Sequence, residues 1–301
     1  MPNPPLLPRS ATARLAVAVT SVVTASAALA GLSVLRRRTH PRTHPRTHPR
    51  TPGPAEVFAI PADAAAPPSP LRQDTGFTPD DGRGTLVRYS VSLPADYYTA
   101  ARRYPVVYAL HGKTQDNVVF LDEALSLRWA MAAGVLDEAV IVTPDGYSTG
   151  RWENRETGPA EDDVIKHLIP HVEQRYRVEP GPEHRLLTGF SMGGHGAIRF
   201  GLKYPTMFAA VWSVDGAMAG SEHYLPLIEG RSSADFRIIA SGGQLNGDRV
   251  ERLVTDLGRH GVRIPFVRQN VRHEFVDFVA EDQRSGWPAL KYLQYHLGRP
   301  L

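Results

Sequence analysis

The residues best suited to chemistry lie in positions 189–194, which read Gly-Phe-Ser-Met-Gly-Gly. A Gly-x-Ser-x-Gly pattern between an apolar strand and a helix is typical of a nucleophile elbow, a tight turn that projects the serine hydroxyl from the carboxyl edge of a sheet. Both neighbours are present, because Leu-Leu-Thr precedes the motif and a helical apolar pattern follows it. We therefore expect Ser191 to be a nucleophile and the backbone N–H of Met192 to stabilise an oxyanion. The alternative is a structural glycine turn that carries a surface serine.

A second oxyanion donor is expected from the loop after an earlier strand. Residues 108–113, Tyr-Ala-Leu-His-Gly-Lys, end the first long apolar run and fit this position. We expect the backbone N–H of Lys113 to be the donor. His111 has two interpretations, as a base in the site or as a side chain that shapes the loop, and its place in chain order favours the second.

The general base should follow the serine in the chain and lie on a loop after the last core strand. His273 meets both conditions, since it comes after the apolar segment 264–267 and before the closing helical pattern. His195 lies four residues after the serine on the elbow helix and is interpreted as a packing or loop-bracing residue.

The carboxylate that should orient the histidine has two candidates. Asp248 is the only carboxylate in the loop after the apolar segment 236–241, where this acid usually lies, although the same residue fits an N-cap of the next helix. Asp215 ends the preceding apolar segment, 208–214. Chain order favours Asp248, and either strand end could supply the group that holds the imidazole tautomer.

The elements that must position these residues alternate regularly. Short apolar runs typical of strands buried on both faces cover 104–110, 139–143, 185–190, 208–214, 236–241 and 264–267. Helical patterns lie between them at 116–133, 161–176, 194–203 and 249–260, and a last helix is expected over 287–297. This alternation predicts an α/β fold, a mostly parallel central sheet with helices on both faces. A looser alternation over 85–93 predicts an antiparallel edge strand.

Composition narrows the classes of function. The 301-residue chain carries a net charge of +3, but eight Arg against two carboxylates give residues 1–70 a charge of +6, and the remainder is therefore near neutral at −3. No basic stripe or phosphate loop suggests nucleic-acid binding. The absence of Cys excludes disulfides and thiolate nucleophiles. We expect no metal and no cofactor.

The N-terminal part differs from the rest. Residues 15–35 are uncharged, apolar and flanked by Arg, which predicts a signal peptide or membrane anchor within residues 1–35. Three Thr-His-Pro-Arg repeats and a Pro/Ala-rich run make 36–70 a disordered linker, followed by one catalytic domain over 71–301. We expect a secreted or membrane-anchored, extracytoplasmic protein, with a cytoplasmic-facing anchor as the competitor. Residues 1–50 could associate with a membrane or cell wall.

The folded part resembles the esterase D type family of the α/β-hydrolases, which includes S-formylglutathione hydrolases, feruloyl and acetylxylan esterases, and mycolyltransferases. The resemblance is carried by Leu-His-Gly (110–112), Pro-Asp-Gly (144–146), Trp152, Leu-Ile-Pro (168–170), Arg-Tyr-Arg (175–177), Gly-Phe-Ser-Met-Gly-Gly-His-Gly-Ala (189–197), Tyr-Pro (204–205), Phe208 and His273. It implies a cofactor-free triad of Ser191, His273 and an acid acting on carboxylic esters. The family's acid usually comes sooner after the glycine of its loop, where this chain has Gln244, Leu245 and Asn246.

These features predict a serine esterase that acts through an acyl-enzyme on a small-molecule or glycan-linked ester. Trp152 could wall a substrate pocket, with His111 beside it, or be purely structural. The alternatives are an envelope acyltransferase of mycolyltransferase type and a non-catalytic surface module, the latter motivated by the acid missing from its usual place.

Overall fold

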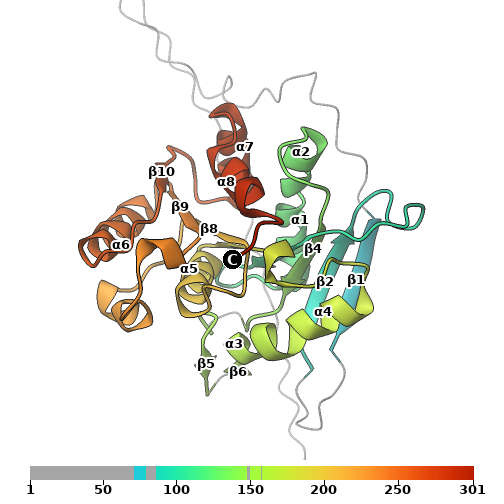
Figure 1. The fold of residues 1–301 in the computed structure, drawn as a ribbon, viewed down its shortest axis with the longest axis horizontal. Helices are drawn as coiled ribbons and strands as arrows, with labels where there is room; N and C mark the ends of the chain where they lie inside the picture. Colours follow the sequence, from blue (N-terminus) through green and yellow to red (C-terminus); the bar gives the residue numbers. More distant parts are fainter. Residues whose placement is uncertain (1–70, 79–85, 148–149, 157) are drawn as a thin grey trace, which may run out of the picture. The chain divides into compact units, whose positions relative to one another are not determined.

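One eight-stranded sheet dominates the computed structural model, which describes residues 71–78, 86–147, 150–156 and 158–301 (Figure 1). Its strands, in spatial order, are β1 (Leu71–Phe77), β2 (Arg88–Leu93), β4 (Val140–Pro144), β3 (Val106–Leu110), β7 (Arg185–Phe190), β8 (Ala210–Val214), β9 (Ile238–Gly242) and β10 (Phe266–Arg268). The six strands from β4 to β10 are mutually parallel, whereas β2 pairs antiparallel with both β1 and β4. A separate short hairpin joins β5 (Asn154–Arg155) to β6 (Gly158–Pro159).

The central strands are buried along their whole length, as their continuous apolar runs require. Successive side chains of a strand point to opposite faces, so Val106 and Val107 of β3 enter two different apolar clusters. Helices must therefore cover both faces of the sheet, as the alternating pattern predicted.

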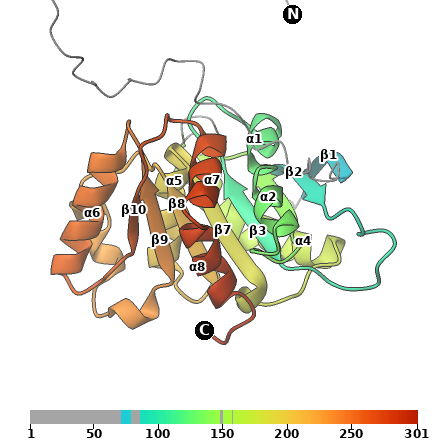
Figure 2. The same ribbon diagram turned by 90° about the horizontal axis from the view of Figure 1, so that it is seen from above.

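Two groups of helices provide this cover (Figure 2). One face packs against α1 (Asn117–Ala124), α2 (Leu127–Ala132), α7 (Phe275–Arg284) and α8 (Pro288–His296). The other packs against α4 (Ile169–Arg175), α5 (Met192–Lys203), α6 (Gly247–Arg259) and a π-helical segment, Asp163–Leu168, that follows the short α3 (Ala160–Asp162). Short 3-10 turns lie at Pro182–His184, Ser221–His223, Leu225–Leu227 and Ser233–Asp235. The predicted α/β-hydrolase architecture is confirmed.

Three local expectations were wrong. The strand predicted over 85–93 is not at the edge, because β1 pairs outside it. The helix expected over 116–133 is two helices, since α1 ends at Ala124 and α2 begins at Leu127. In the helix expected over 161–176, the turn before Pro170 winds as a π-helix, with the Ile169 N–H bonded to Val164 O. The predicted targeting segment and linker lie outside the described residues.

Candidate active site

The serine of the elbow occupies a strained turn between strand and helix. Strand β7 ends at Phe190 and α5 begins at Met192, so Ser191 alone makes the change of direction. Its backbone has φ 55° and ψ −111°, a conformation that non-glycine residues rarely adopt. Such strain persists only where the surroundings enforce it, and it is characteristic of functional sites.

Two glycines allow this turn to form. A Cβ at Gly189 would overlap the backbone of Gly193, and a Cβ at Gly193 would overlap the carbonyl oxygen of Leu110 at the end of β3. The elbow is therefore pressed against the exit of the neighbouring strand. This close approach gives the physical reason for the glycines in the motif.

The predicted oxyanion donors belong to two segments that lie next to the serine. Met192 is the first residue of α5, and the first amides of a helix have no intrahelical partner. From the β3 side, a Cβ at Gly112 would lie 3.5 Å from the Cβ of Ser191, so the loop that continues into Lys113 passes beside the serine. This loop, residues 111–115, is called the oxyanion loop after its predicted role. Thr114 in this loop has φ 67°, a second strained position.

The structure supports a loop-shaping role for His111. This side chain is fully buried, its Nδ1–H donates to the Gly112 carbonyl at 2.7 Å, and its Nε2 accepts from the Gly146 N–H at 2.9 Å. Both ring nitrogens are thus used to fasten the loop.

The interpretation of Trp152 as a pocket wall was wrong. Its side chain is also 0% exposed, packs edge-on against His111 at 4.9 Å between ring centroids, and donates from Nε1 to the His111 carbonyl at 3.1 Å. A side chain without accessible surface cannot contact a substrate. Trp152 is instead a support beneath the oxyanion loop, as the structural alternative held, and His111 is equally inaccessible to substrate.

His273 lies beside the elbow and is oriented by a buried carboxylate. Its ring packs against Phe190, the residue before the serine, with centroids 4.5 Å apart. Nδ1 of His273 lies 2.5 Å from Oδ2 of Asp215. Because a carboxylate accepts, Nδ1 carries the proton and Nε2 is left as a proton acceptor.

Asp215 is held by backbone groups of the next loop. It follows β8 at φ 42° and is fully buried. Its Oδ1 accepts the N–H of Gly243 at 2.8 Å and of Asn246 at 3.2 Å, and the Asn246 side chain donates to the Asp215 carbonyl at 2.9 Å. Strands β8 and β9 are parallel neighbours, so the loop after β9 reaches the end of β8. That loop thus supplies donors to the carboxylate.

The preference for Asp248 was wrong in its geometry. Asp248 lies within the first turn of α6, its side chain is 80% exposed, and it pairs with Arg268 at 2.9 Å. Three residues separate it from Gln244, so the chain has already entered the helix and the carboxylate faces solvent. It is not the N-cap either, since Asn246 occupies that position.

His195 forms a second buried cluster on the elbow helix. Its Nε2–H donates to Glu153 at 3.0 Å, and its Nδ1 accepts from the Tyr224 hydroxyl at 2.5 Å. The hydrogen bond from His195 is the largest influence that lowers the pKa of Glu153 to about 2, while burial lowers the pKa of His195. The loop-bracing role predicted for His195 agrees with these contacts, which join α5 to two loops.

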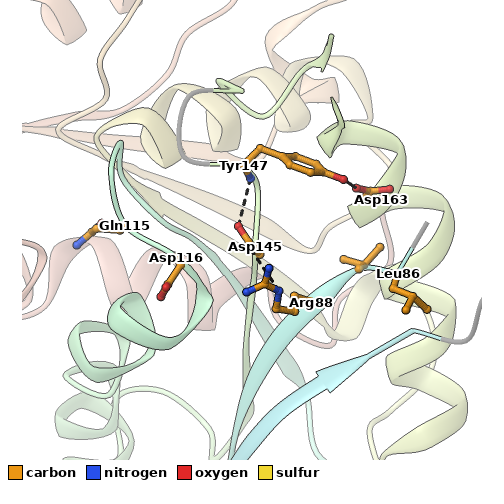
Figure 3. A pocket seen from close by; sticks show the side chains of 8 residues that line it. Leu86, Arg88, Gln115, Asp116, Asp145, Tyr147 and Asp163 are labelled. Carbon is orange, nitrogen blue, oxygen red and sulfur yellow. Dashed lines mark hydrogen bonds and ion pairs between the residues drawn. The ribbon is translucent and has the colours of Figure 1, made fainter. Parts of the chain in front are cut away.

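A cavity of about 330 Å³ opens beside Gln115, and its lining includes neither Ser191 nor His273 (Figure 3). Gln115 belongs both to its wall and to the oxyanion loop, because its Oε1 accepts the Gly112 N–H at 2.8 Å. The Tyr147 hydroxyl donates to Asp163 at 3.0 Å across the cavity wall. The lining residues are Leu86, Val87, Arg88, Gln115, Asp116, Asp145, Tyr147 and Asp163.

The described part of the chain offers neither a metal site nor a membrane span. Among those residues, no group of three or more His, Asp or Glu side chains is arranged to hold a metal ion. Within the same ranges, no helix has the length and apolarity needed to cross a membrane.

Comparisons with known proteins agree with this geometry. A family model described as "Esterase: Putative esterase" matches residues 84–235. Esterase Rv1288 of Mycobacterium tuberculosis (strain H37Rv) is 35% identical over 132 residues, which are 42% of this chain and 28% of that protein. The match therefore spans under a third of the length of this curated relative.

Solved structures show the same fold. A ferulic acid esterase superposes with a TM-score of 0.63 at 21% identity, covering 74% of this chain and 97% of that one. The serine hydrolase FphF of Staphylococcus aureus superposes with a TM-score of 0.58 at 15% identity, covering 72% and 96%. The family model covers more than half of the sequence, and the resemblance noted from the motifs is confirmed: the chain belongs to the esterase family of the α/β-hydrolase fold.

Proposed function

We propose that this protein is a serine esterase that hydrolyses a carboxylic ester through an acyl-enzyme on Ser191. The observation that carries the proposal is the 2.5 Å contact between His273 Nδ1 and the buried Asp215, made beside a serine held at φ 55°. In the neutral imidazole, this contact places the proton on Nδ1 and leaves Nε2 as the nitrogen that can accept a proton. Family membership supports the same chemistry.

In the proposed acylation step, His273 Nε2 takes the Ser191 hydroxyl proton as Oγ attacks the ester carbonyl carbon. The oxygen that becomes negative receives hydrogen bonds from the backbone N–H groups of Met192 and Lys113. Asp215 stabilises the imidazolium. When the tetrahedral intermediate collapses, the C–O bond to the alcohol breaks, and His273 returns the proton to the leaving alcohol oxygen.

Deacylation uses the same groups with water in place of the serine. His273 takes a proton from water, the resulting hydroxide attacks the acyl carbon, and Ser191 Oγ leaves with the proton from the imidazolium. Every proton transfer is therefore made by one residue. No step requires a metal or a cofactor.

We expect the substrate to be a small ester. A ferulic acid esterase shares the fold, which makes an aromatic acyl group one candidate.

A fluorophosphonate probe and a panel of p-nitrophenyl esters test the proposal. The folded protein should be labelled at Ser191 and should release p-nitrophenol, and Ser191→Ala should abolish both. A wild-type protein that is folded but neither labelled nor active would instead favour the non-catalytic module. The non-catalytic alternative was based on the acid missing from its usual place, and Asp215 now provides a carboxylate beside His273. Product analysis with and without a sugar acceptor distinguishes hydrolysis from acyl transfer.

The cellular location is a separate proposal that rests on the sequence of residues 15–35. An apolar segment flanked by Arg supports export, with the domain outside the cytoplasm. N-terminal sequencing of the mature protein and fractionation of expressing cells test this directly. Recovery of the intact chain in the cytosol would contradict it.

A further inference from the structure

Two polar side chains connect the oxyanion loop to the end of helix α1. Oε1 of Gln115 accepts the N–H of Gly112 at 2.8 Å, and Nε2 of the same amide donates to Oε1 of Glu123 at 2.5 Å. These two hydrogen bonds link the backbone N–H of Gly112, through the side-chain amide of Gln115, to the carboxylate of Glu123 on α1. The proposed catalytic cycle does not use either side chain.

The carboxylate of Glu123 lies where two elements of the site meet. Helix α1 packs against α7 through Phe120 and Phe275, whose ring centroids are 5.3 Å apart. Helix α7 begins two residues after His273, so the same contact supports the loop that carries the base. Glu123 is thus placed between the oxyanion loop and the histidine loop.

Glu123 is poorly solvated for a carboxylate. Its Oε2 is buried, and burial is the largest influence raising the pKa of Glu123. The neighbouring Glu274 raises this pKa as well, whereas the hydrogen bond from Gln115 acts in the opposite direction. A buried carboxylate lowers the stability of the fold, and a role in the active site would explain why it is present here.

We propose that Gln115 and Glu123 are positioning residues that fix the peptide of Gly112 so that the next amide, that of Lys113, faces the oxyanion. The inference rests on the proposed esterase function and adds residues that the triad does not contain. The strained Thr114 shows why the loop needs support, because φ 67° is unfavourable for this residue without external contacts.

Each member of the pair has a distinct task. The amide of Gln115 has an accepting end and a donating end, and only one orientation places its oxygen against the Gly112 N–H. Glu123 selects this orientation, because a carboxylate accepts and so attracts the NH₂ end. Without Glu123, rotation of the amide by 180° would bring its NH₂ group against the N–H of Gly112.

The expected effect is specific to the transition state. Loss of an oxyanion donor in other hydrolases lowers kcat by about 10²–10³-fold. Misplacement of one donor should cost part of this, so Gln115→Ala and Glu123→Ala should each lower kcat about 10–100-fold with little change in KM. The ground-state ester carbonyl makes weaker use of the same donor.

The variants are Gln115→Ala, Glu123→Ala, their double variant and Glu123→Gln, assayed with p-nitrophenyl acetate. Because both residues act through one hydrogen-bonded line, the double variant should be no slower than Gln115→Ala. Glu123→Gln keeps an oxygen that can accept from Gln115, and it should recover most of the kcat lost in Glu123→Ala.

Gln294→Ala is the matched control. Oε1 of Gln294 on α8 accepts the backbone N–H of Asp137 at 2.9 Å, the same type of contact made away from the elbow. This variant should lose a hydrogen bond of the same type while keeping the wild-type kcat.

The Ki of an aryl boronic acid distinguishes a positioning role from a purely structural one, because loss of stability alone would leave this Ki unchanged. The adduct of the boronic acid with the serine is tetrahedral and occupies the oxyanion site, so the Ki should rise in proportion to the loss of kcat/KM across the variants. The Ki should be unchanged in Gln294→Ala.

The outcomes separate the two proposals. A folded wild-type protein that neither reacts with fluorophosphonate nor turns over esters overturns the esterase assignment, and this inference with it. A labelled, active wild type whose Gln115→Ala and Glu123→Ala variants keep kcat and boronate Ki within threefold overturns only the inference. If Gln115→Ala does not fold, the two Glu123 variants provide the test. Equal kcat and boronate Ki values in Glu123→Ala and Glu123→Gln then overturn the inference.

Discussion

Replacing Asp215 by asparagine tests the assigned acid, because the amide is nearly the same shape as the carboxylate but has one donating end. One orientation of the introduced amide would place its NH₂ group against the N–H groups of Gly243 and Asn246, which now bond Oδ1. Two buried donors would then be unsatisfied, at about 1–3 kcal/mol each. The other orientation places NH₂ against His273 Nδ1 and requires only that the imidazole change its tautomer.

The second orientation should therefore be adopted, and its consequence for kcat is large. With Nδ1 accepting from the amide, the proton moves to Nε2, and His273 can no longer take a proton from Ser191. The same loss in a Ser-His-Asp protease lowers kcat about 10⁴-fold, so we expect a decrease of about 10³–10⁴-fold. This corresponds to about 4–5.5 kcal/mol in activation free energy.

Initial rates with p-nitrophenyl acetate, with folding checked by thermal melting, measure this effect. Asp248→Asn is the matched control, because it removes only an exposed ion pair with Arg268, worth under about 1 kcal/mol. It should keep kcat within twofold. If Asp215→Asn retains more than a tenth of wild-type kcat, or if Asp248→Asn is the slower variant, the assignment of Asp215 is refuted.

Three further predictions concern stability and pH. Gly189→Ala should prevent folding or lower the free energy of unfolding by more than about 3 kcal/mol, because the added Cβ would overlap backbone atoms. Gly258→Ala should raise the free energy of unfolding by about 0.5–1 kcal/mol, because Gly258 lies on α6 with open space around it. Chemical denaturation measures both effects. The pKa of Glu153 is lowered from 4.5 to about 2, so the stabilisation that its ionised carboxylate provides is present above pH 4.5 and is lost as the pH falls towards 2. Over this pH range, the Tm of the wild type should therefore fall more steeply than the Tm of Glu153→Gln. Trp152→Phe removes a buried hydrogen bond and should cost about 1–3 kcal/mol of stability without changing KM; a raised KM at unchanged stability would restore a substrate-binding role.

The sequence was sufficient for the features that depend on local pattern. Continuous apolar runs identified the core strands within about two residues, because a strand buried on both faces has no polar positions to break the run. The motif around Ser191 was equally readable, since its glycines are demanded by backbone overlap within a few residues. Chain order alone led to the prediction that His273 lies near the elbow, and its ring does pack against Phe190.

The features that depend on contacts between distant segments were not readable. Strand β1 has Gln73, Asp74 and Gly76 among seven residues, and it forms through pairing with β2 rather than through its own apolar content. Helix α7 was missed because its pattern, Phe-Val-Asp-Phe-Val-Ala-Glu-Asp-Gln-Arg, follows directly on the histidine loop. Gln115 and Glu123 have no motif, and only the coordinates bring them together.

The error over the acid has a physical origin that extends beyond this chain. Parallel neighbours β8 and β9 end side by side, so a carboxylate at the end of either strand can reach the same imidazole. The choice then depends on which strand end can satisfy the second carboxylate oxygen. Here the loop after β9 has Gly243 and Asn246, whose N–H groups are free to donate, and it carries no carboxylate until the helix has begun. When the loop after β9 supplies N–H donors and has no carboxylate, the acid should therefore be sought in an Asp directly after β8.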